Sequence, residues 1–414
     1  MTANSRRFTA AALILCVCLP SICRGQSPSG LQGQPVVARV EMKLMNADGV
    51  IDVIEKGDLL TVLREREDDY VISTHDGTKG AVAKVNALRV IESVGVYSEL
   101  IKAAPKEGRY YTLRASAWWA RGDAAKALQD FDQAIELGYT EPHAYSSRGL
   151  FHAANGDLKK AIADYDQAIK LDPKDSSLLI NRAAIHLSSG QAEQALLDYD
   201  QAVELEPNST NALHQRAIAH KSAGQLEEAA NDFTKILELE PDDLRAIMGR
   251  GYLHFQQQKH PLAIADFGRA VELNPGDAVA WNNRGYNRYQ VGEIEDAIAD
   301  YRQAIQLQPE YALALQNLAW ALATSPDEAL RDPKKAIESA EAACKLSNYE
   351  SVGDLSALAA ACAAEGKFER AVGWQEKVVA KVDAQYKTFA EKMLQRYEQG
   401  KPFAADSDAD ASDR

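Results

Sequence analysis

The stretch AIADYDQAIKLDP at residues 161–173 returns almost unchanged as AIADYRQAIQLQP at residues 297–309. The second copy starts 136 residues after the first, which is four times 34. Other columns keep the same spacing: prolines at Pro173, Pro207, Pro241, Pro275 and Pro309, and aspartates followed by an aromatic residue at Asp130, Asp164, Asp198, Asp232, Asp266 and Asp300. A fixed period of this length predicts an array of similar structural units, each of which buries its apolar face against the next.

Each 34-residue unit has the pattern of two helices. In the quoted stretch, Ala161, Tyr165 and Ala168 fall four and three residues apart and form one stripe on a helix. The segment before it ends at Gly156, because glycine readily adopts the left-handed turn that closes a helix. Pro173 ends the second helix, since proline cannot continue the hydrogen-bond ladder. We therefore expect a helix-turn-helix unit in which alanines let the two helices approach closely.

The period, the turn glycine, the small residues and the closing proline resemble the tetratricopeptide repeat. The resemblance implies a mainly α fold, a right-handed α-solenoid of stacked helix-turn-helix repeats over residues 108–382, with about eight units. It places six regular units at 108–141, 142–175, 176–209, 210–243, 244–277 and 278–311. A seventh unit begins near Ala312 and contains the insertion TSPDEALRDPKK, and an eighth begins near Asp354.

The segments that flank the repeats carry separate predictions. Residues 93–107 are expected to form a linker and a half-repeat helix, and residues 383–400 an amphipathic helix that caps the array. Residues 401–414, which end in ADSDADASDR, are expected to be a disordered acidic tail. Inside the array, Gln258 stands where other units have the turn glycine, so we expect backbone strain of about 1 kcal/mol or a different turn there.

Residues 36–92 change from helical to strand periodicity. DLLTVLRE, YVISTH and GAVAKVNALRVIE are short runs rich in β-branched residues, separated by turn signals. The order of these runs resembles a bacterial Src-homology-three-like domain, which implies a small β-barrel. Tyr70 stands where the peptide-binding members have a tryptophan pair, and Ala83 where they have a groove proline, so polyproline recognition is not expected. Docking of cell-wall glycan or of a partner stays open.

Residues 1–25 are expected to be a secretory signal peptide. Arg6 and Arg7 precede an apolar run that stops at Pro20, which is too short for a mature membrane span. We predict cleavage before Gln26, an extracytoplasmic mature protein that is periplasmic or secreted, and no membrane insertion after the signal is removed.

The chain is acidic, with a formal net charge of −14. Arg6, Arg7 and Arg24 leave with the predicted signal peptide, which makes the mature charge −17. Nucleic-acid binding depends on Lys and Arg side chains that displace counterions from phosphates, so we exclude nucleic acid as a partner.

The sequence contains no recognisable catalytic or metal-binding motif. It contains no G-x-x-x-x-G-K loop, no G-x-S-x-G elbow, no H-E-x-x-H helix and no paired-cysteine zinc pattern, so we predict no enzyme activity and no cofactor. Equivalent residues of successive units lie about 10 Å apart, whereas zinc needs nitrogens about 2 Å away. We therefore predict no metal site, and a packing or hydrogen-bond role for the histidine column His152, His186, His220 and His254. Cys344 and Cys362 either form a disulfide or pack as small apolar residues.

Arginines recur in the first helix of each unit, where leucine is the commoner residue of the resembling family. They occupy Arg114, Arg148, Arg182, Arg216, Arg250 and Arg284, each 16 residues before one of the repeated aspartates. We predict a ladder of Arg-Asp pairs, partly buried between helices, in which the planar guanidinium satisfies the carboxylate.

The resemblance also implies where a partner would bind. In that family the first helices line a concave groove, and an asparagine there holds the backbone of an extended peptide, because an amide donates and accepts hydrogen bonds together. Carried onto this sequence, the partner-binding positions are Asn181, His214, Gln215, Arg245, Tyr252, Asn282, Asn283, Tyr286, Tyr289 and Asn317, with Trp119, Ser147, Leu150, Ile180, Met248 and Gly249 beside them.

These observations predict a non-catalytic protein-protein interaction scaffold outside the cytoplasm, which binds an extended peptide or a partner protein in the groove of the repeats. The alternative is a structural protein of the cell envelope, in which the Src-homology-three-like domain contacts cell-wall glycan. The oligomeric state stays open, since a second copy could fill the concave face.

Overall fold

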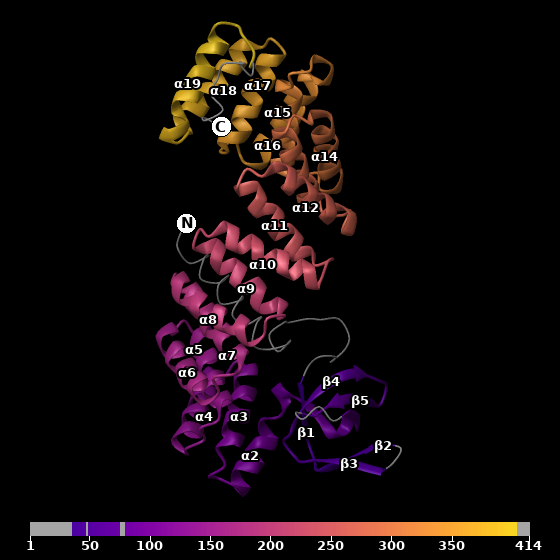
Figure 1. The fold of residues 1–414 in the computed structure, drawn as a ribbon, viewed down its shortest axis with the longest axis vertical. Coiled ribbons are helices and arrows are strands. Elements are labelled where there is room, and N and C mark those ends of the chain that lie inside the picture. Colours follow the sequence, from indigo (N-terminus) through magenta and orange to yellow (C-terminus); the bar gives the residue numbers. More distant parts are fainter. Residues whose placement is uncertain (1–34, 47–48, 75–78, 404–414) are drawn as a thin grey trace. The chain divides into compact units, whose positions relative to one another are not determined.

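The computed structural model describes residues 35–46, 49–74 and 79–403, and the chain divides into two compact units (Figure 1). The first unit reaches Gly224 and the second starts at Gln225. The predicted signal peptide at residues 1–25 and residues 404–414 of the predicted acidic tail lie outside the described residues. In the described part of the chain, no helix combines the length and the apolar character that crossing a bilayer requires.

The first unit begins with β1 (Pro35–Ala38), β2 (Met42–Asn46), β3 (Gly49–Ile54), β4 (Leu59–Glu65), β5 (Asp69–Ser73), β6 (Lys79–Ala83) and β7 (Ala87–Arg89). Five strands form one antiparallel sheet in the order β6-β5-β4-β1-β7, and β2 pairs with β3 in a second sheet. The expected closed barrel is therefore wrong, because β6 and β7 are the outer strands of an open sheet. Strand β7 has only 3 residues and runs directly into a 3-10 helix at Val90–Glu92, which leaves it too short to close the sheet.

Helices make up the rest of the first unit: α2 (Val94–Ala103), α3 (Gly108–Ala120), α4 (Ala124–Glu136), α5 (Pro142–Ala154), α6 (Leu158–Leu171), α7 (Ser176–Ser188), α8 (Ala192–Leu205) and α9 (Thr210–Ser222). The helices α3/α4, α5/α6 and α7/α8 are antiparallel pairs in contact. The sheet is fastened to the first of these helices. Tyr97 of α2 donates a hydrogen bond to the Gly57 carbonyl at 3.1 Å, and Arg109 of α3 pairs with Asp58 at 3.1 Å.

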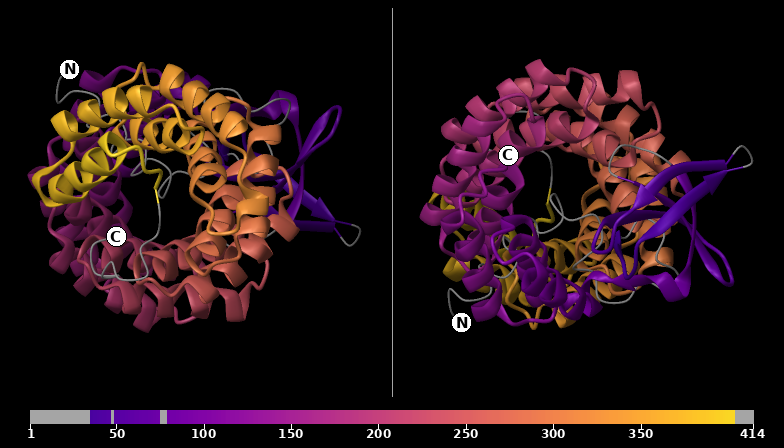
Figure 2. Two further views of the ribbon diagram at one scale, coloured as in Figure 1. Left: turned by 90° about the horizontal axis from the view of Figure 1, so that it is seen from above. Right: turned by 90° about the horizontal axis from the view of Figure 1, so that it is seen from below.

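The second unit is helical throughout: α10 (Leu226–Leu239), α11 (Leu244–Gln256), α12 (His260–Leu273), α13 (Ala278–Gln290), α14 (Ile294–Leu307), α15 (Ala312–Thr324), α16 (Pro333–Leu346), α17 (Val352–Ala364), α18 (Phe368–Lys381) and α19 (Ala384–Glu398). The insertion between α15 and α16 contains a 3-10 helix at Glu328–Leu330. Within each unit the helix pairs follow one another side by side (Figure 2). The predicted mainly α solenoid of helix-turn-helix units is confirmed.

The repeated small and aromatic residues form the contacts between helices. Ala161 is fully buried and Tyr165 is 1% exposed, so the apolar stripe of α6 lies wholly inside the stack. A Cβ atom at Gly149 would lie 3.1 Å from the Tyr165 ring, which explains why the residue after Arg148 is small. The constant period therefore reflects one packing solution used in each unit.

The turn between the two helices of a unit needs a left-handed residue. Gly292 has a φ of +87°, and Gln258, in the unit before it, has a φ of +58°. Gln258 thus keeps the turn that glycine makes elsewhere, and it does so in a conformation that a side chain disfavours by about 1 kcal/mol. The expectation of strain at this position is confirmed.

The predicted Arg-Asp ladder is present. Each guanidinium donates to both carboxylate oxygens of the aspartate 16 residues later in the pairs Arg114–Asp130, Arg148–Asp164, Arg182–Asp198, Arg250–Asp266 and Arg284–Asp300. Three arginines also reach back to an aspartate of the preceding unit, in Arg148–Asp132, Arg182–Asp166 and Arg216–Asp200. One guanidinium therefore joins two successive second helices through the first helix that lies between them.

The histidine column and the cysteines have structural roles. His254 Nδ1 lies 3.1 Å from Asp266 Oδ2, and His186 Nδ1 lies 2.8 Å from Gln191 Oε1. Among the described residues, no group of three or more His, Cys, Asp or Glu side chains is arranged to hold a metal. Cys344 and Cys362 are free, fully buried thiols within one apolar core cluster, so they pack as small residues and do not form a disulfide.

Candidate functional site

The first helices of neighbouring pairs approach one another, α3 to α5 and α7 to α9 in the first unit, and α13 to α15 and α15 to α17 in the second. Their side chains therefore form a surface that crosses several repeats. Residues spaced three or four apart on a first helix reach this surface together. One pocket on this surface lies in the first compact unit, and another lies in the second.

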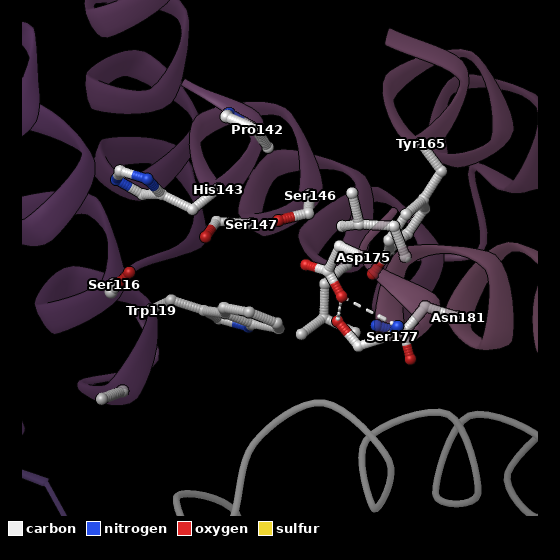
Figure 3. A pocket seen from close by; sticks show the side chains of 13 residues that line it. Ser116, Trp119, Pro142, His143, Ser146, Ser147, Tyr165, Asp175, Ser177 and Asn181 are labelled. Carbon is white, nitrogen blue, oxygen red and sulfur yellow. Dashed lines mark hydrogen bonds between the residues drawn. The ribbon is translucent and has the colours of Figure 1, made fainter. Parts of the chain in front are cut away.

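The first pocket has a volume of about 420 Å³ and lies among α3, α5, α6 and α7 (Figure 3). Helix α5 contributes the stripe His143, Ser146, Ser147 and Leu150, and the other lining residues are Ser116, Trp119, Ala120, Pro142, Tyr165, Asp175, Ser177, Leu178 and Asn181. The lining therefore combines one indole ring, four serine hydroxyls, one amide and one carboxylate. It contains no lysine or arginine.

Asn181 gives this pocket unused hydrogen-bonding capacity. The residue is 9% exposed and belongs to the pocket lining (Figure 3). Within the described residues its amide has no hydrogen-bond partner, although an amide can donate and accept. The amide atoms reach solvent at the pocket, so a ligand there can replace water as their hydrogen-bond partner.

Asp175 places a negative charge at the same pocket. Its Oδ1 accepts hydrogen bonds from the Ser177 backbone nitrogen at 2.9 Å and from Ser177 Oγ at 2.6 Å, which caps the start of α7. Both bonds go to one oxygen, so Oδ2 remains able to accept from a ligand. Asp175 was absent from the predicted residues. In the sequence, Asp175 could be recognised as the N-cap residue of α7. An N-cap position alone, however, does not predict that the carboxylate borders a pocket.

Trp119 forms the wall of the pocket opposite Asp175, and its ring packs against Phe151. Its ring meets Phe151 edge to face, with centroids 5.7 Å apart and planes at 75°. Figure 3 shows Trp119 and Asp175 bordering the same space from α3 and from the start of α7. A rigid aromatic wall of this kind contributes contact area at a low cost in conformational entropy.

The second unit carries a chain of aromatic rings along α11 and α13. Tyr252 lies 5.7 Å from Phe255, and Phe255 lies 5.4 Å from Tyr286, measured between ring centroids. Burial raises the pKa of Tyr286, so its hydroxyl stays protonated as a donor at neutral pH. Tyr252 remains 39% exposed, which leaves the start of this chain of rings open to solvent.

The second pocket, of about 280 Å³, continues from these rings. It is lined by Tyr286, Tyr289, Gln290, Tyr301, Gln316, Asn317, Trp320, Gly353 and Ser356. Two amides beside it are already paired, because Asn317 Nδ2 donates to Asn282 Oδ1 at 3.0 Å. Tyr289 Oη lies 3.1 Å from Thr324 Oγ1. The polar groups here are therefore more fully bonded within the protein than those of the first pocket.

The predicted partner-binding residues separate into groups. Asn181 lines the first pocket, and Tyr286, Tyr289 and Asn317 line the second. His214 and Asn282 are buried, at 5% and 1% exposure, which places their side chains inside the stack. Arg245 points outward beside Asp243, and Arg245, Gln215, Tyr252 and Asn283 line neither pocket.

Sequence reasoning missed several lining residues of the second pocket. Trp320, Gln316 and Ser356 lie on α15 and α17, where the units are irregular. The insertion after α15 breaks the 34-residue period, so the register of the regular units does not extend to Ser356 on α17. Gln316 and Trp320 precede the insertion and lie 34 residues after the predicted Asn282 and Tyr286, so the same register could have identified them. The tryptophan itself was a usable signal, because aromatic residues concentrate at binding surfaces.

Models of the tetratricopeptide repeat match residues 81–142, 142–175, 164–196, 214–278 and 278–311. Together these matches span more than half of the 414 residues. The chain therefore belongs to the tetratricopeptide repeat proteins. No match among curated proteins was found, and the resemblance of residues 36–92 to a Src-homology-three-like domain stays a prediction.

Solved structures with the same repeat resemble parts of the chain. YrrB, described as a tetratricopeptide repeat protein with an unusual peptide-binding site, is 22% identical over 45% of this chain and 95% of its own, with a TM-score of 0.40. A tetratricopeptide repeat protein from Parabacteroides merdae is 19% identical over 73% of this chain and 98% of its own, with a TM-score of 0.41. The C-terminal part of a repeat protein from Cytophaga hutchinsonii is 16% identical over 55% and 94%, with a TM-score of 0.49.

Proposed function

We propose that this protein is a non-catalytic interaction scaffold that binds an extended segment of a partner protein on the first-helix surface of its repeats. The observation that carries the proposal is the pocket of about 420 Å³ lined by Asn181, whose amide has no hydrogen-bond partner among the described residues. A peptide bond offers both an acceptor and a donor to such an amide, whatever the side chain beside it. The pocket thus suits backbone recognition.

The charge around this pocket favours one kind of segment. Asp175 has a carboxylate oxygen free to accept, Trp119 offers an indole face, and the lining contains no lysine or arginine. A lysine or arginine of the partner would gain from both the carboxylate and the aromatic face. The net charge of −14 also attracts a basic partner at long range and slows an acidic one.

We place this activity outside the cytoplasm, as the apolar segment after Arg6 and Arg7 indicates for secretion. The envelope alternative, in which residues 36–92 hold cell-wall glycan, has less support. Tyr70 is the one aromatic residue between 36 and 92, and it is 9% exposed. Sugar rings are usually bound against exposed aromatic faces, which this region does not supply.

A peptide array tests the proposal. Purified protein is applied to immobilised 12-residue peptides of varied sequence, and the dissociation constants of the peptides that bind are measured in solution. Asn181→Ala is expected to weaken binding about tenfold, because one or two backbone hydrogen bonds are lost. Asp175→Asn is expected to weaken binding only of peptides that contain lysine or arginine. Asn208→Ala is the matched control, since Asn208 is exposed and does not line the pocket.

Equal affinities of the Asn181→Ala, Asp175→Asn and parent proteins would exclude this pocket as the binding site. Circular dichroism on each variant confirms that the repeats remain folded. For the envelope alternative, the same protein is sedimented with purified peptidoglycan. Sedimentation that persists in both variants, together with an array that binds nothing, would favour the alternative.

A further inference from the structure

A column of aromatic residues runs along the first helices of the second unit. Tyr252 on α11, Tyr286 on α13 and Trp320 on α15 occupy the same position of three successive repeats, 34 residues apart. The earlier repeats have aliphatic residues at this position, namely Leu150, Ala184 and Ile218. The repeat fold therefore does not require an aromatic ring there, and the column is a property of the second unit.

The spacing of these rings suits a helix with three residues per turn. The centroid of Phe255 lies 5.7 Å from that of Tyr252 and 5.4 Å from that of Tyr286. Tyr252 and Tyr286 are therefore separated by at most the sum of these two distances, about 11 Å. A polyproline II helix rises about 3.1 Å per residue, so its turns are about 9 Å apart. One proline per turn can thus meet one ring per repeat.

The second pocket, which Tyr286 and Trp320 both line, carries no charge. None of its lining residues is Asp, Glu, Lys, Arg or His. A charged side chain of a partner would lose hydration there without gaining an ion pair. Prolines, in contrast, are uncharged and pack against the aromatic side chains of grooves that recognise them. The lining therefore favours a neutral segment, whereas Asp175 gives the first pocket a negative charge.

Two polar groups of the second pocket are available as donors. Among the described residues, neither the Trp320 indole nitrogen nor the Gln316 amide has a hydrogen-bond partner, and both reach solvent. Gly353 leaves room for this amide, since a Cβ atom there would lie 2.7 Å from Gln316 Oε1. Proline has a carbonyl acceptor but no N–H donor, so a proline-rich backbone needs donors from its binding site.

The aromatic rings are held by contacts within the second unit. Gln290 hydrogen-bonds to the Tyr286 hydroxyl, and Tyr289 Oη lies close to the Thr324 hydroxyl. Phe403 meets Trp320 edge to face, with centroids 5.2 Å apart, and it does not line the pocket. Trp320 is thus supported by Phe403 and still presents part of its ring to the pocket. Rings that are already ordered lose little conformational entropy when a ligand binds.

We propose that the second pocket and the adjoining rings of α11 bind a proline-rich segment in the polyproline II conformation. Prolines spaced three residues apart pack against Tyr252, Tyr286 and Trp320. The Trp320 indole and the Gln316 amide donate hydrogen bonds to the carbonyl groups between them. This inference rests on the proposed function, because it names the class of extended segment that the second unit takes, but it uses no residue of the first pocket.

Fluorescence anisotropy tests the proposal on the full-length protein. A fluorescein-labelled peptide APPAPPAPPAPP is titrated beside ASSASSASSASS, which has the same length and a serine in place of each proline. We expect the proline peptide to bind at least tenfold tighter. Its polyproline II conformation is already formed in solution, and only its proline rings can pack against the aromatic column.

Three variants and one matched control assign the binding to this pocket. Tyr286→Ala removes the central ring and is expected to weaken binding at least tenfold. Trp320→Phe keeps an aromatic ring and removes the N–H donor, and Gln316→Ala removes the amide, so each is expected to weaken binding about fivefold. Trp281→Phe is the control for Trp320→Phe. Trp281 Nε1 donates to the Pro275 carbonyl at 2.9 Å and the residue lines neither pocket, so binding is expected to stay unchanged.

The two pockets are distinguished by crossing the variants and the peptides. Asn181→Ala is expected to leave binding of the proline peptide unchanged, because Asn181 lines the first pocket. Tyr286→Ala is expected to leave binding of lysine-containing peptides unchanged. Loss of the lysine-containing peptides alone from the array would contradict the proposed use of the first pocket and leave this inference intact.

The inference is overturned if the proline peptide does not bind, if the serine peptide binds equally well, or if all three variants bind the proline peptide as tightly as the parent protein. Circular dichroism on each variant excludes unfolding as the cause of a loss, and Trp320→Phe and Gln316→Ala remove no core side chain. Binding of an N-acetylglucosamine oligomer instead of the proline peptide would make the pocket a sugar site and would also overturn the inference.

Discussion

Arg182 Nε lies 2.8 Å from Asp198 Oδ2, and the Arg182 terminal nitrogen Nη2 lies 2.6 Å from Asp198 Oδ1. The carboxylate is 5% exposed, so the two parallel bonds replace the water that it would otherwise bind. The other terminal nitrogen, Nη1, lies 2.7 Å from Asp166 Oδ1 in the preceding unit. One side chain thus ties the helices of two successive repeats together.

Replacing Arg182 by leucine is expected to lower the free energy of unfolding by about 3 kcal/mol or more, because Asp198 remains buried without a partner. The shift of the urea midpoint, followed by circular dichroism, measures this. The double variant Arg182→Leu/Asp198→Leu is expected to recover much of the loss, since an apolar pair of similar volume is often tolerated. If the single variant matches the parent in stability, the ladder is dispensable.

Gln258→Gly is expected to stabilise the second unit by about 1 kcal/mol, because glycine removes the strain of a left-handed backbone. Gly292→Ala is the reciprocal change at the same turn of the next unit. No atom lies within 4 Å of a Cβ built there, so its expected loss of stability comes from the backbone alone. Denaturant midpoints measure both effects, and a neutral or destabilising Gln258→Gly would contradict the strain.

Stability should depend on pH through His152, which is buried, and His254, which is partly buried. Burial lowers the pKa of His152 and of His254 below the ordinary value, against the opposing pull of Asp164 and Asp266. The unfolded chain, with histidine pKa near 6.5, therefore binds protons more readily than the folded chain. The free energy of unfolding is expected to be constant above about pH 7 and to fall as pH is lowered through 6.5.

Urea midpoints between pH 5.5 and 7.5 measure this dependence. His254→Gln is expected to flatten the slope, because one of the two groups no longer titrates. His143→Gln serves as the control, since His143 borders the open pocket of the first unit. A slope that His254→Gln leaves unchanged would assign the dependence to other groups.

The two thiols of the second unit should be inert in the folded protein. Burial raises the pKa of Cys344 to about 12 and that of Cys362 above its ordinary value, which leaves almost no thiolate at neutral pH. Iodoacetamide is expected to modify neither residue in native buffer and both in guanidinium chloride, as located by peptide mass spectrometry. Rapid labelling of Cys344 in native buffer would show that α16 and α17 separate readily.

The repeat architecture was predictable because each unit repeats a local pattern. Ala161, Tyr165 and Gly156 report on helix stripes and a turn whose geometry depends on near neighbours. The Arg-Asp pairs were predictable for the same reason, because residues that are 16 apart occupy the same two helix positions in every repeat. Asn181 followed from that register, and it does line a pocket.

The errors concern contacts between residues that the period does not relate. The strand pattern of residues 36–92 indicated a barrel, but closure depends on which strands pair, and in the described residues β2 and β3 form a separate two-stranded sheet. The roles of His214 and Asn282 stay predictions. Both lie on first helices, and how far each side chain reaches the surface depends on how closely neighbouring helices approach, which the period does not encode.

The amino-acid sequence alone determined the helix-turn-helix unit, its period and the ion pairs inside the stack, since these follow from short-range spacing that recurs along the chain. Only the tertiary structure decided which side chains line a pocket, that Asp175 borders Trp119, and that Phe403 reaches Trp320. Those contacts join residues far apart in the chain, and their existence depends on the summed small rotations between repeats, which no single repeat encodes.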